Sequence, residues 1–386
     1  MIESAIAFAA LLLLIAGGLF TLERYTDWRL FRVLPPIVLI YLLVTTLAVL
    51  GTWQATVEIQ QTQKLITSRL LPALLFLLLT TCDLRAILAL GPRMLGAFAC
   101  ATGTILLAFV IVFAALGRWL PTDAPASLAT LSGSWTGGTA NLLAVKQAIG
   151  LPESALSQVL LTDAVCYSVW VLTLFSAAPF AARFNHWSGA RDLALTPAHS
   201  AAPINATPDV GSLLLWFGIS LLVGSVAAQL ASLMPTSNVL SPTSWTLLLV
   251  TAAGLIYAHT PLARLPGSSS LASALLAIVV AAMASQSNFN DLASAPRFLL
   301  AGFCVLGVHA LLMLIAAKIF RFDLFTCSVC SLANIGGPAS APLLAAMYSP
   351  VLAPIGILLA MLGYVFGTGL GIGLASVLTR IAAMMG

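Results

Sequence analysis

Long apolar runs alternate with short polar intervals along almost the whole chain. Windows of about twenty apolar residues, enough to cross the hydrocarbon core of a bilayer, recur twelve times. They fall at roughly 4–22, 31–52, 66–82, 91–119, 124–149, 154–178, 211–233, 243–261, 270–288, 296–320, 324–348 and 351–376. The one long polar interval, 179–210, is rich in Pro, Ala, Ser and Asn. It is predicted to be a linker between two halves, 1–178 and 211–386.

The amino-acid composition indicates the fold class of the chain. Hydrophobic residues make up 60% of the 386 positions and charged residues only 7%, with a mean hydropathy of +1.06. These values predict an all-α polytopic membrane protein. The first window lacks a preceding basic region and a following cleavage site, so it is expected to be a span and not a signal peptide. The 16 basic residues form no patch, and no nucleic-acid partner is expected.

A short polar motif occurs inside two of the apolar windows. Residues 132–146 contain Gly137-Gly138, and a looser copy at 331–345 contains Gly336-Gly337, 199 residues later. Each glycine costs a helix about 1 kcal/mol, and Pro338 in the second copy removes a backbone donor. The motifs predict two broken helices, which survive in a membrane only where protein or a cavity surrounds them. Paired interruptions of this kind indicate a transporter's binding site, although small residues also let helices pack closely.

Basic residues at segment ends predict the orientation, because Lys and Arg in short loops prefer the cytoplasm. The residues used are Arg24, Arg29, Arg32, Arg85, Arg93, Lys146, Arg264, Lys318, Arg321 and Arg380. They predict an external N-terminus, an internal C-terminus and two halves with inverted topology. Twelve full spans would make the halves parallel, so one segment between about 150 and 261 is expected not to cross. The resulting prediction is about 11 spans, within a range of 10–12.

One acidic residue, Asp163, lies deep inside an apolar window. An ionised carboxylate facing lipid there would cost at least ~2.5 kcal/mol, so its side chain is expected to face the bundle interior and bind a cation or a proton. Thr162, Tyr167 and Ser168 lie within about a helical turn and are predicted to add oxygen ligands. The alternative is a buried structural aspartate. His309, also within a span, is either a proton relay or a neutral histidine bonded to a neighbouring helix.

The helix breaks themselves offer groups for a solute. A helix that resumes after a break presents unpaired N–H groups and a positive dipole end, which suit a carboxylate. The half-helix before the break presents carbonyls, which suit a cation. The predicted substrate-binding residues are Thr136, Gly137, Gly138, Thr139, Asn141, Asn334, Gly336, Gly337, Pro338 and Ser340. No metal site is expected, including at Cys327 and Cys330, which have redox spacing but no suitable context.

Four motifs carry a resemblance to a known family. They span Ser134–Asn141 with Ala144–Gly150, Thr162–Tyr167, Ser331–Pro342 and Gly363–Gly371. These motifs resemble the YjcL-like family of uncharacterised bacterial membrane proteins. That family looks like a branch of the superfamily of cation/proton antiporters and bile-acid-type sodium symporters.

The resemblance implies a core domain from about 91–178 and 296–376, in which the broken helices cross. It also implies a panel domain from the rest of the chain, a homodimer and elevator-like alternating access. Asp163 falls on the helix after the first broken helix, where antiporters of the superfamily keep ion-binding carboxylates. Thr162 stands before it, whereas such antiporters commonly carry a second acidic residue or Asn, and this departure favours symport.

Together these features predict a secondary active transporter in a bacterial inner membrane. It is expected to move a small polar organic solute by symport with Na+ or H+, the coupling ion, and to need no cofactor. Cation/proton antiport through Asp163 is the alternative within transport, and a non-transporting scaffold or receptor is the alternative outside it. No helix carries a nucleophile–base pair or a His/Glu metal cluster, so an enzyme with catalytic residues is not expected.

Overall fold

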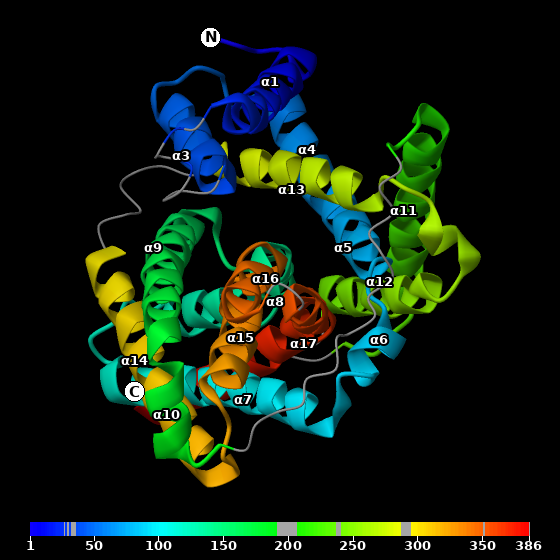
Figure 1. The fold of residues 1–386 in the computed structure, drawn as a ribbon. Coiled ribbons are helices and arrows are strands. Elements are labelled where there is room, and N and C mark those ends of the chain that lie inside the picture. Colours follow the sequence, from blue (N-terminus) through cyan, green and yellow to red (C-terminus); the bar gives the residue numbers. More distant parts are fainter. Residues whose placement is uncertain are drawn as a thin grey trace.

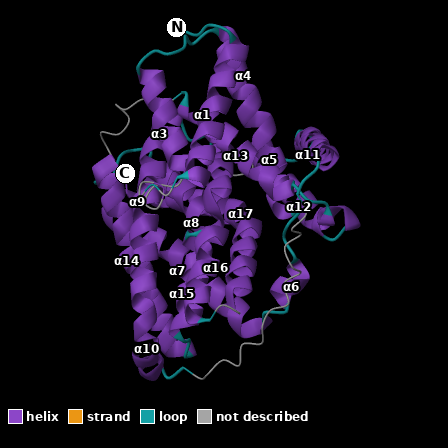
Figure 2. Cartoon of the chain, turned by 45° about the horizontal axis from the view of Figure 1, so that its top comes forward, coloured by secondary structure: helices purple, strands orange, loops and turns teal. Residues whose placement is uncertain are grey.

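The structure is a computed structural model that describes residues 1–26, 28, 31, 36–190, 207–236, 241–286, 295–349 and 352–385. The elements formed by these residues are helices, joined by loops (Figure 2). The only strand-like pairing among them is an isolated bridge between Ile2 and Trp53. The all-helical prediction is therefore confirmed for the described part of the chain.

The first half of the chain contains the helices that precede the long polar interval. They are α1 (Ala5–Tyr25), α3 (Pro36–Val49), α4 (Val57–Leu65), the π-helical turn η1 (Ile66–Leu70), α5 (Leu71–Leu79), α6 (Leu84–Leu88), α7 (Gly91–Leu116), α8 (Ala124–Ile149), α9 (Glu153–Ala177), the 3-10 turn η2 (Ala178–Phe180) and α10 (Ala181–Ser188).

The second half follows with a similar series. Its helices are α11 (Val210–Ala231), α12 (Pro242–Ala258), the 3-10 turn η3 (Pro261–Arg264), α13 (Ser268–Ala284), α14 (Ala295–Phe320), α15 (Leu324–Ile335), α16 (Gly337–Tyr348) and α17 (Ala353–Met385). Each of the twelve apolar windows corresponds to one helix or to one consecutive set of helices.

Within the described residues, seven helical segments are long and apolar enough to cross a membrane, which is compatible with a multi-pass membrane protein. They are 5–25, 57–79, 91–116, 153–188, 210–231, 295–320 and 353–385. The shorter apolar helices of the same residues are α3, α12, α13 and α15. The number of crossings and the orientation of the termini stay predictions. Two of the arginines used to predict that orientation, Arg29 and Arg32, lie outside the described residues.

The helices form two packing groups, which Figure 1 separates. One group, at the top and right of the view, contains α1, α3, α4, α5, α11, α12 and α13, which contact one another in sequence-distant pairs such as α3 with α13 and α5 with α12. The other contains α7, α8, α9, α14, α15, α16 and α17, with α8 packed along α17 and α7 along α14. Both broken-helix motifs belong to the second group. The division into core and panel domains stays a prediction, and this packing agrees with it.

The polar interval 179–210 begins as a helix, where the sequence predicts a linker. Helix α9 continues through η2 into α10, which ends at Gly189 in the left-handed conformation (φ 69°). The Asn185 side chain accepts a hydrogen bond from the backbone N–H of Leu324 at 2.9 Å, and Lys318 Nζ donates to the Trp187 carbonyl at 2.5 Å. This helix therefore contacts the end of α14 and the start of α15. Residues 191–206 lie outside the described part.

One charge used to predict orientation has a structural partner. Lys146, near the end of α8, is buried and forms an ion pair with Glu153 at the start of α9. Gly150 makes the turn between the two helices with φ 70°. This partly buried ion pair connects the end of α8 to the start of α9. Because Lys146 has this structural partner, its position indicates the membrane side less directly than that of an exposed lysine.

Candidate functional site

The first helix break lies within α8. Gly138 is the residue of this helix whose backbone is not helical, with φ 78° and ψ 174°. Gly137 keeps a helical backbone, although the sequence predicts that both glycines unwind. A Cβ at Gly137 would overlap Asn141 Nδ2 and lie 2.7 Å from the Gly363 carbonyl oxygen of α17. Gly137 is therefore required for close packing on α17, and Gly138 for the change of backbone direction.

The second break separates α15 from α16. Helix α15 ends at Ile335, Gly336 follows with φ −106°, and Gly337 has φ 66°. A Cβ at Gly337 would have no neighbouring atom within 4 Å. The Ser340 side chain is 4% exposed, points back toward Gly336 and has no hydrogen-bond partner among the described residues. This break therefore holds both open space and an unsatisfied buried hydroxyl group.

The Asp163 carboxylate faces the first break. Ser134 Oγ donates to its Oδ2 and Trp135 Nε1 donates to its Oδ1, each at 2.9 Å. Both donors lie in α8, within about one helical turn before Gly138. The described part of the chain contains a single ion pair, Lys146–Glu153, so the carboxylate is held by neutral donors. It is thus positioned in the bundle without a resident cationic side chain.

Helix α9 reaches both breaks with one face. Tyr167 stands one helical turn after Asp163, and its ring lies against Gly336, 2.9 Å from where a Cβ would be. The Tyr364 ring of α17 lies 3.3 Å from the corresponding position at Gly138. Each half of the chain therefore supplies a tyrosine to the break of the other half.

Two asparagines hold the broken helices to their neighbours. Asn141 Nδ2 donates to the Gly137 carbonyl at 2.6 Å, across the break, and its Oδ1 accepts from Thr368 of α17. Asn334 Nδ2 donates to the Cys330 carbonyl at 2.9 Å, and its Oδ1 accepts from Thr102 of α7 at 2.8 Å. Both amides are buried and have partners for their oxygen and their nitrogen.

His309 of α14 is fully buried in a polar cluster. Its Nδ1 lies 2.9 Å from Thr104 Oγ1, which donates to the Ala101 carbonyl, so Nδ1 carries the proton. Its Nε2 lies 2.8 Å from Ser331 Oγ, which in turn accepts from Trp170 Nε1 at 3.0 Å. Both ring nitrogens thus bond to side-chain hydroxyl groups, whereas the alternative to a relay expected a bond to the backbone of a neighbouring helix. The relay function stays a prediction.

Other predicted residues use their polar atoms locally or have a hydroxyl group without a partner among the described residues. Thr162 is fully buried and packs its methyl group against Gly302 of α14, and its hydroxyl has no partner among the described residues. Thr136 donates to the Ser132 carbonyl and Ser168 to the Ala164 carbonyl, both at 2.8 Å. Thr139 and Pro338 are partly buried in the first turns after the breaks.

Sequence reasoning did not select four residues that shape this region. They are Ser134, Trp135, Tyr364 and Thr368. Trp135 gave a usable signal, because an indole N–H inside an apolar segment needs an acceptor and Asp163 lies in the next helix. Tyr364 and Thr368 lie in the Gly363–Gly371 motif, but only the fold, in which α17 packs along α8, brings them to the first break.

These features define the class of the chain: a protein whose described part is all-helical, with seven candidate membrane spans and two interrupted helices in one packing group. The chain belongs to the protein family of unknown function DUF819, whose model matches residues 10–381. No curated protein matches it.

Proposed function

We propose that this chain is a secondary active transporter that moves a small polar organic solute by symport with Na+ or H+. One observation carries the proposal: a single helix, α9, brings Asp163 to the first helix break and Tyr167 to the second. Interrupted helices with an intramembrane carboxylate beside them are the arrangement that ion-coupled transporters use to bind a solute and its ion together.

The proposal includes inverted repeats. The reciprocal placement of Tyr167 at the second break and Tyr364 at the first is expected of two halves related by a two-fold axis in the membrane plane. The packing of α7 along α14, the helices that precede the two breaks, fits the same relation. In this scheme the group of α7–α9 and α14–α17 is the moving core, and α1, α3–α5 and α11–α13 form a panel that also mediates a homodimer in a bacterial inner membrane.

The two breaks have separate tasks in this mechanism. The first holds the coupling cation, since the Asp163 carboxylate accepts two hydrogen bonds from neutral groups and has no charged side chain as a permanent partner among the described residues. The second binds the solute, because the N-terminal end of α16, with Ser340 unpartnered beside it among the described residues, suits a carboxylate or another electronegative group.

The coupling ion is tested by thermal unfolding of the purified protein in detergent, in NaCl and in choline chloride, between about pH 5.5 and 8.5. A ligand at a hundred times its dissociation constant stabilises the folded state by about 2.7 kcal/mol. We expect a sodium-specific rise in Tm that Asp163→Asn abolishes. Asp123→Asn is the matched control, because this carboxylate accepts from Ser127 and Gln158 away from the breaks and its loss leaves the sodium response in place.

Each alternative outcome has a defined meaning. A pH-dependent Tm without a sodium effect, lost in Asp163→Asn, would assign the site to a proton and favour either proton symport or the antiport alternative. Solute-dependent proton uptake into proteoliposomes then separates these two. A sodium and pH response that is the same in wild type and Asp163→Asn would contradict the proposed role of this carboxylate.

A further inference from the structure

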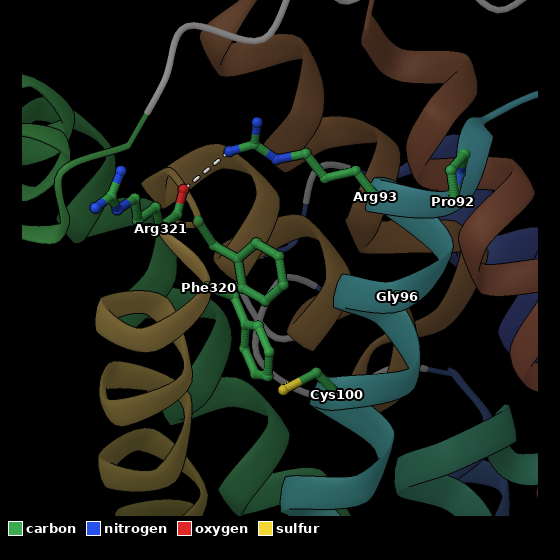
Figure 3. Close-up of a pocket in the computed structure, with 7 residues that line it drawn as sticks. Pro92, Arg93, Gly96, Cys100, Phe320 and Arg321 are labelled. Atoms are coloured by element: carbon green, nitrogen blue, oxygen red, sulfur yellow. Dashed lines mark hydrogen bonds between the residues drawn. The ribbon is translucent and has the colours of Figure 1, made fainter.

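A pocket outside the broken-helix region lies between the start of α7 and the end of α14 (Figure 3). It has a volume of about 760 Å³ and is lined by Pro92, Arg93, Gly96, Cys100, Phe320, Arg321 and Phe322. Arg93 and Arg321 lie at one end of the pocket, and Phe320 and Cys100 lie farther along it. The pocket is therefore amphipathic, with positive charge at one end and aromatic surface at the other.

Arg321 occupies a backbone position that normally requires glycine. It has φ 54°, and the N–H of Phe322 donates to the Ala317 carbonyl at 3.0 Å. This is the Schellman arrangement, in which the left-handed residue after a helix is usually glycine. A side chain there costs roughly 1 kcal/mol or more. Strained residues that persist tend to have a functional reason, and the feature this one adds is a guanidinium group at one end of the pocket.

The positive charge at this end of the pocket is not neutralised by the described part of the protein. Arg93 Nη2 donates to the Arg321 carbonyl at 2.9 Å, and neither arginine forms an ion pair within the described residues. The nearby carboxylate of Asp323 is occupied, since it accepts from both the N–H and the hydroxyl of Thr326. Lys318 is held by Trp187 of α10. Both guanidinium groups therefore keep donors for an external anion.

The apolar side of the pocket continues onto the outer surface of the bundle. Phe320 is 59% exposed, and its ring stacks on Phe322 at a centroid distance of 5.5 Å. Gly96 of α7 leaves open space where a side chain would stand. Further exposed apolar residues on α7 and α14 are Leu107, Ile111, Leu311, Leu314, Ile315 and Ile319. A bound molecule can thus extend from the arginines along a hydrophobic surface suited to contact with acyl chains.

We propose that this pocket binds an anionic phospholipid of the surrounding membrane. Its phosphate bonds to the guanidinium groups of Arg93 and Arg321, and one acyl chain lies over Phe320 and past Gly96. Guanidinium groups bind phosphate oxygens in pairs, and basic pockets between membrane helices are suited to anionic headgroups. The site is separate from the helix breaks, so the proposal does not depend on transport.

Native mass spectrometry and thermal unfolding with added dioleoyl phosphatidylglycerol or dioleoyl phosphatidylcholine test the site. We expect phosphatidylglycerol to bind more tightly and to raise Tm, and each arginine removed to lower its affinity about fivefold. Arg321→Gly is the most informative variant, because glycine relieves the left-handed backbone. This variant is expected to be at least as stable as the wild type without lipid and to bind phosphatidylglycerol about fivefold more weakly, with a smaller rise in Tm.

The control variant is Arg118→Gln, at the other end of α7, where the arginine also donates to a backbone carbonyl, that of Met385. It is expected to keep the lipid response, whereas Arg93→Gln reduces it. Equal binding of both lipids, or an unchanged response in Arg321→Gly and Arg93→Gln, would overturn the proposal. Equal stabilisation by soluble glycerol phosphate would also overturn it, since the site would then recognise a free anion and not a lipid.

Discussion

The two helix breaks share a Gly-Gly pair, a buried asparagine and a tyrosine from the other half of the chain, and they differ in how the backbone is interrupted. In the first, only Gly138 leaves the helical conformation, and Asn141 bridges the interruption to the Gly137 carbonyl. In the second, α15 ends before α16 begins, Gly337 faces open space and Ser340 has a hydroxyl that the described residues leave unsatisfied. The first glycine of each pair is tightly packed, Gly137 by Asn141 and Gly336 by Tyr167, so the breaks differ in the open space at Gly337 and in the unpartnered Ser340 hydroxyl.

This difference is the basis for proposing different functions for the two copies of the motif. In the proposed mechanism, the break beside Asp163 holds the coupling cation, because Ser134 and Trp135 fix the carboxylate. The second break contacts the solute, because the Ser340 hydroxyl has no partner among the described residues. Each of these two proposals has its own test.

The largest expected effect is a difference in stability between the alanine variants of Gly137 and Gly337. Gly137→Ala places a methyl group against Asn141 and the backbone of Gly363, and we expect a loss of about 3 kcal/mol of stability from overpacking. The methyl group of Gly337→Ala meets no neighbour among the described residues. This variant is expected to lose only about 1 kcal/mol of stability, because alanine is strained in the left-handed conformation. Thermal unfolding in detergent measures both. Equal losses would show that the second break is as tightly packed as the first.

A smaller difference in stability is expected between the alanine variants of Ser134 and Ser340. Ser134→Ala removes a donor from the Asp163 carboxylate and should cost about 2 kcal/mol, whereas Ser340→Ala removes a hydroxyl without a partner among the described residues and should leave stability unchanged or slightly higher. The same substitution at the two breaks thus gives different Tm shifts. A loss at Ser340 as large as that at Ser134 would mean that Ser340 has a structural bond, and the open character of the second break would be wrong.

Much of the fold follows from hydropathy and glycine placement. The twelve apolar windows match the helices because lipid forces each backbone to satisfy its own hydrogen bonds, which leaves helix as the favoured local solution. Gly138 and Gly337 could be predicted as break points because two adjacent glycines weaken a helix at a defined place within such a window. Composition did not predict α10, because Phe184 and Trp187 make only a short amphipathic surface within a polar interval.

The candidate site was predicted less completely than the fold, because the residues that contact Asp163 and the helix breaks come from segments distant in the sequence. Asp163 stands out alone as a carboxylate in an apolar window, and the indole N–H of Trp135 needs an acceptor, but only the fold shows that Trp135 donates to Asp163. Tyr364 reaches Gly138 only because α17 packs along α8. The spacing of residues in the sequence predicts ligands only among the neighbours of Asp163 on its own helix. One of these neighbours, Thr162, instead packs its methyl group against Gly302 on α14.

Hydrogen–deuterium exchange of the protein in lipid nanodiscs, resolved at single amides around the two breaks, tests the central claim most directly. Amides exchange where local structure opens or lacks hydrogen bonds. The account predicts faster exchange at residues 337–341 than at 138–142, since Asn141 bridges the first break, whereas Gly337 faces open space and Ser340 has no hydrogen-bond partner among the described residues. Equal exchange at the two breaks, or faster exchange around Gly138, would contradict the division of tasks.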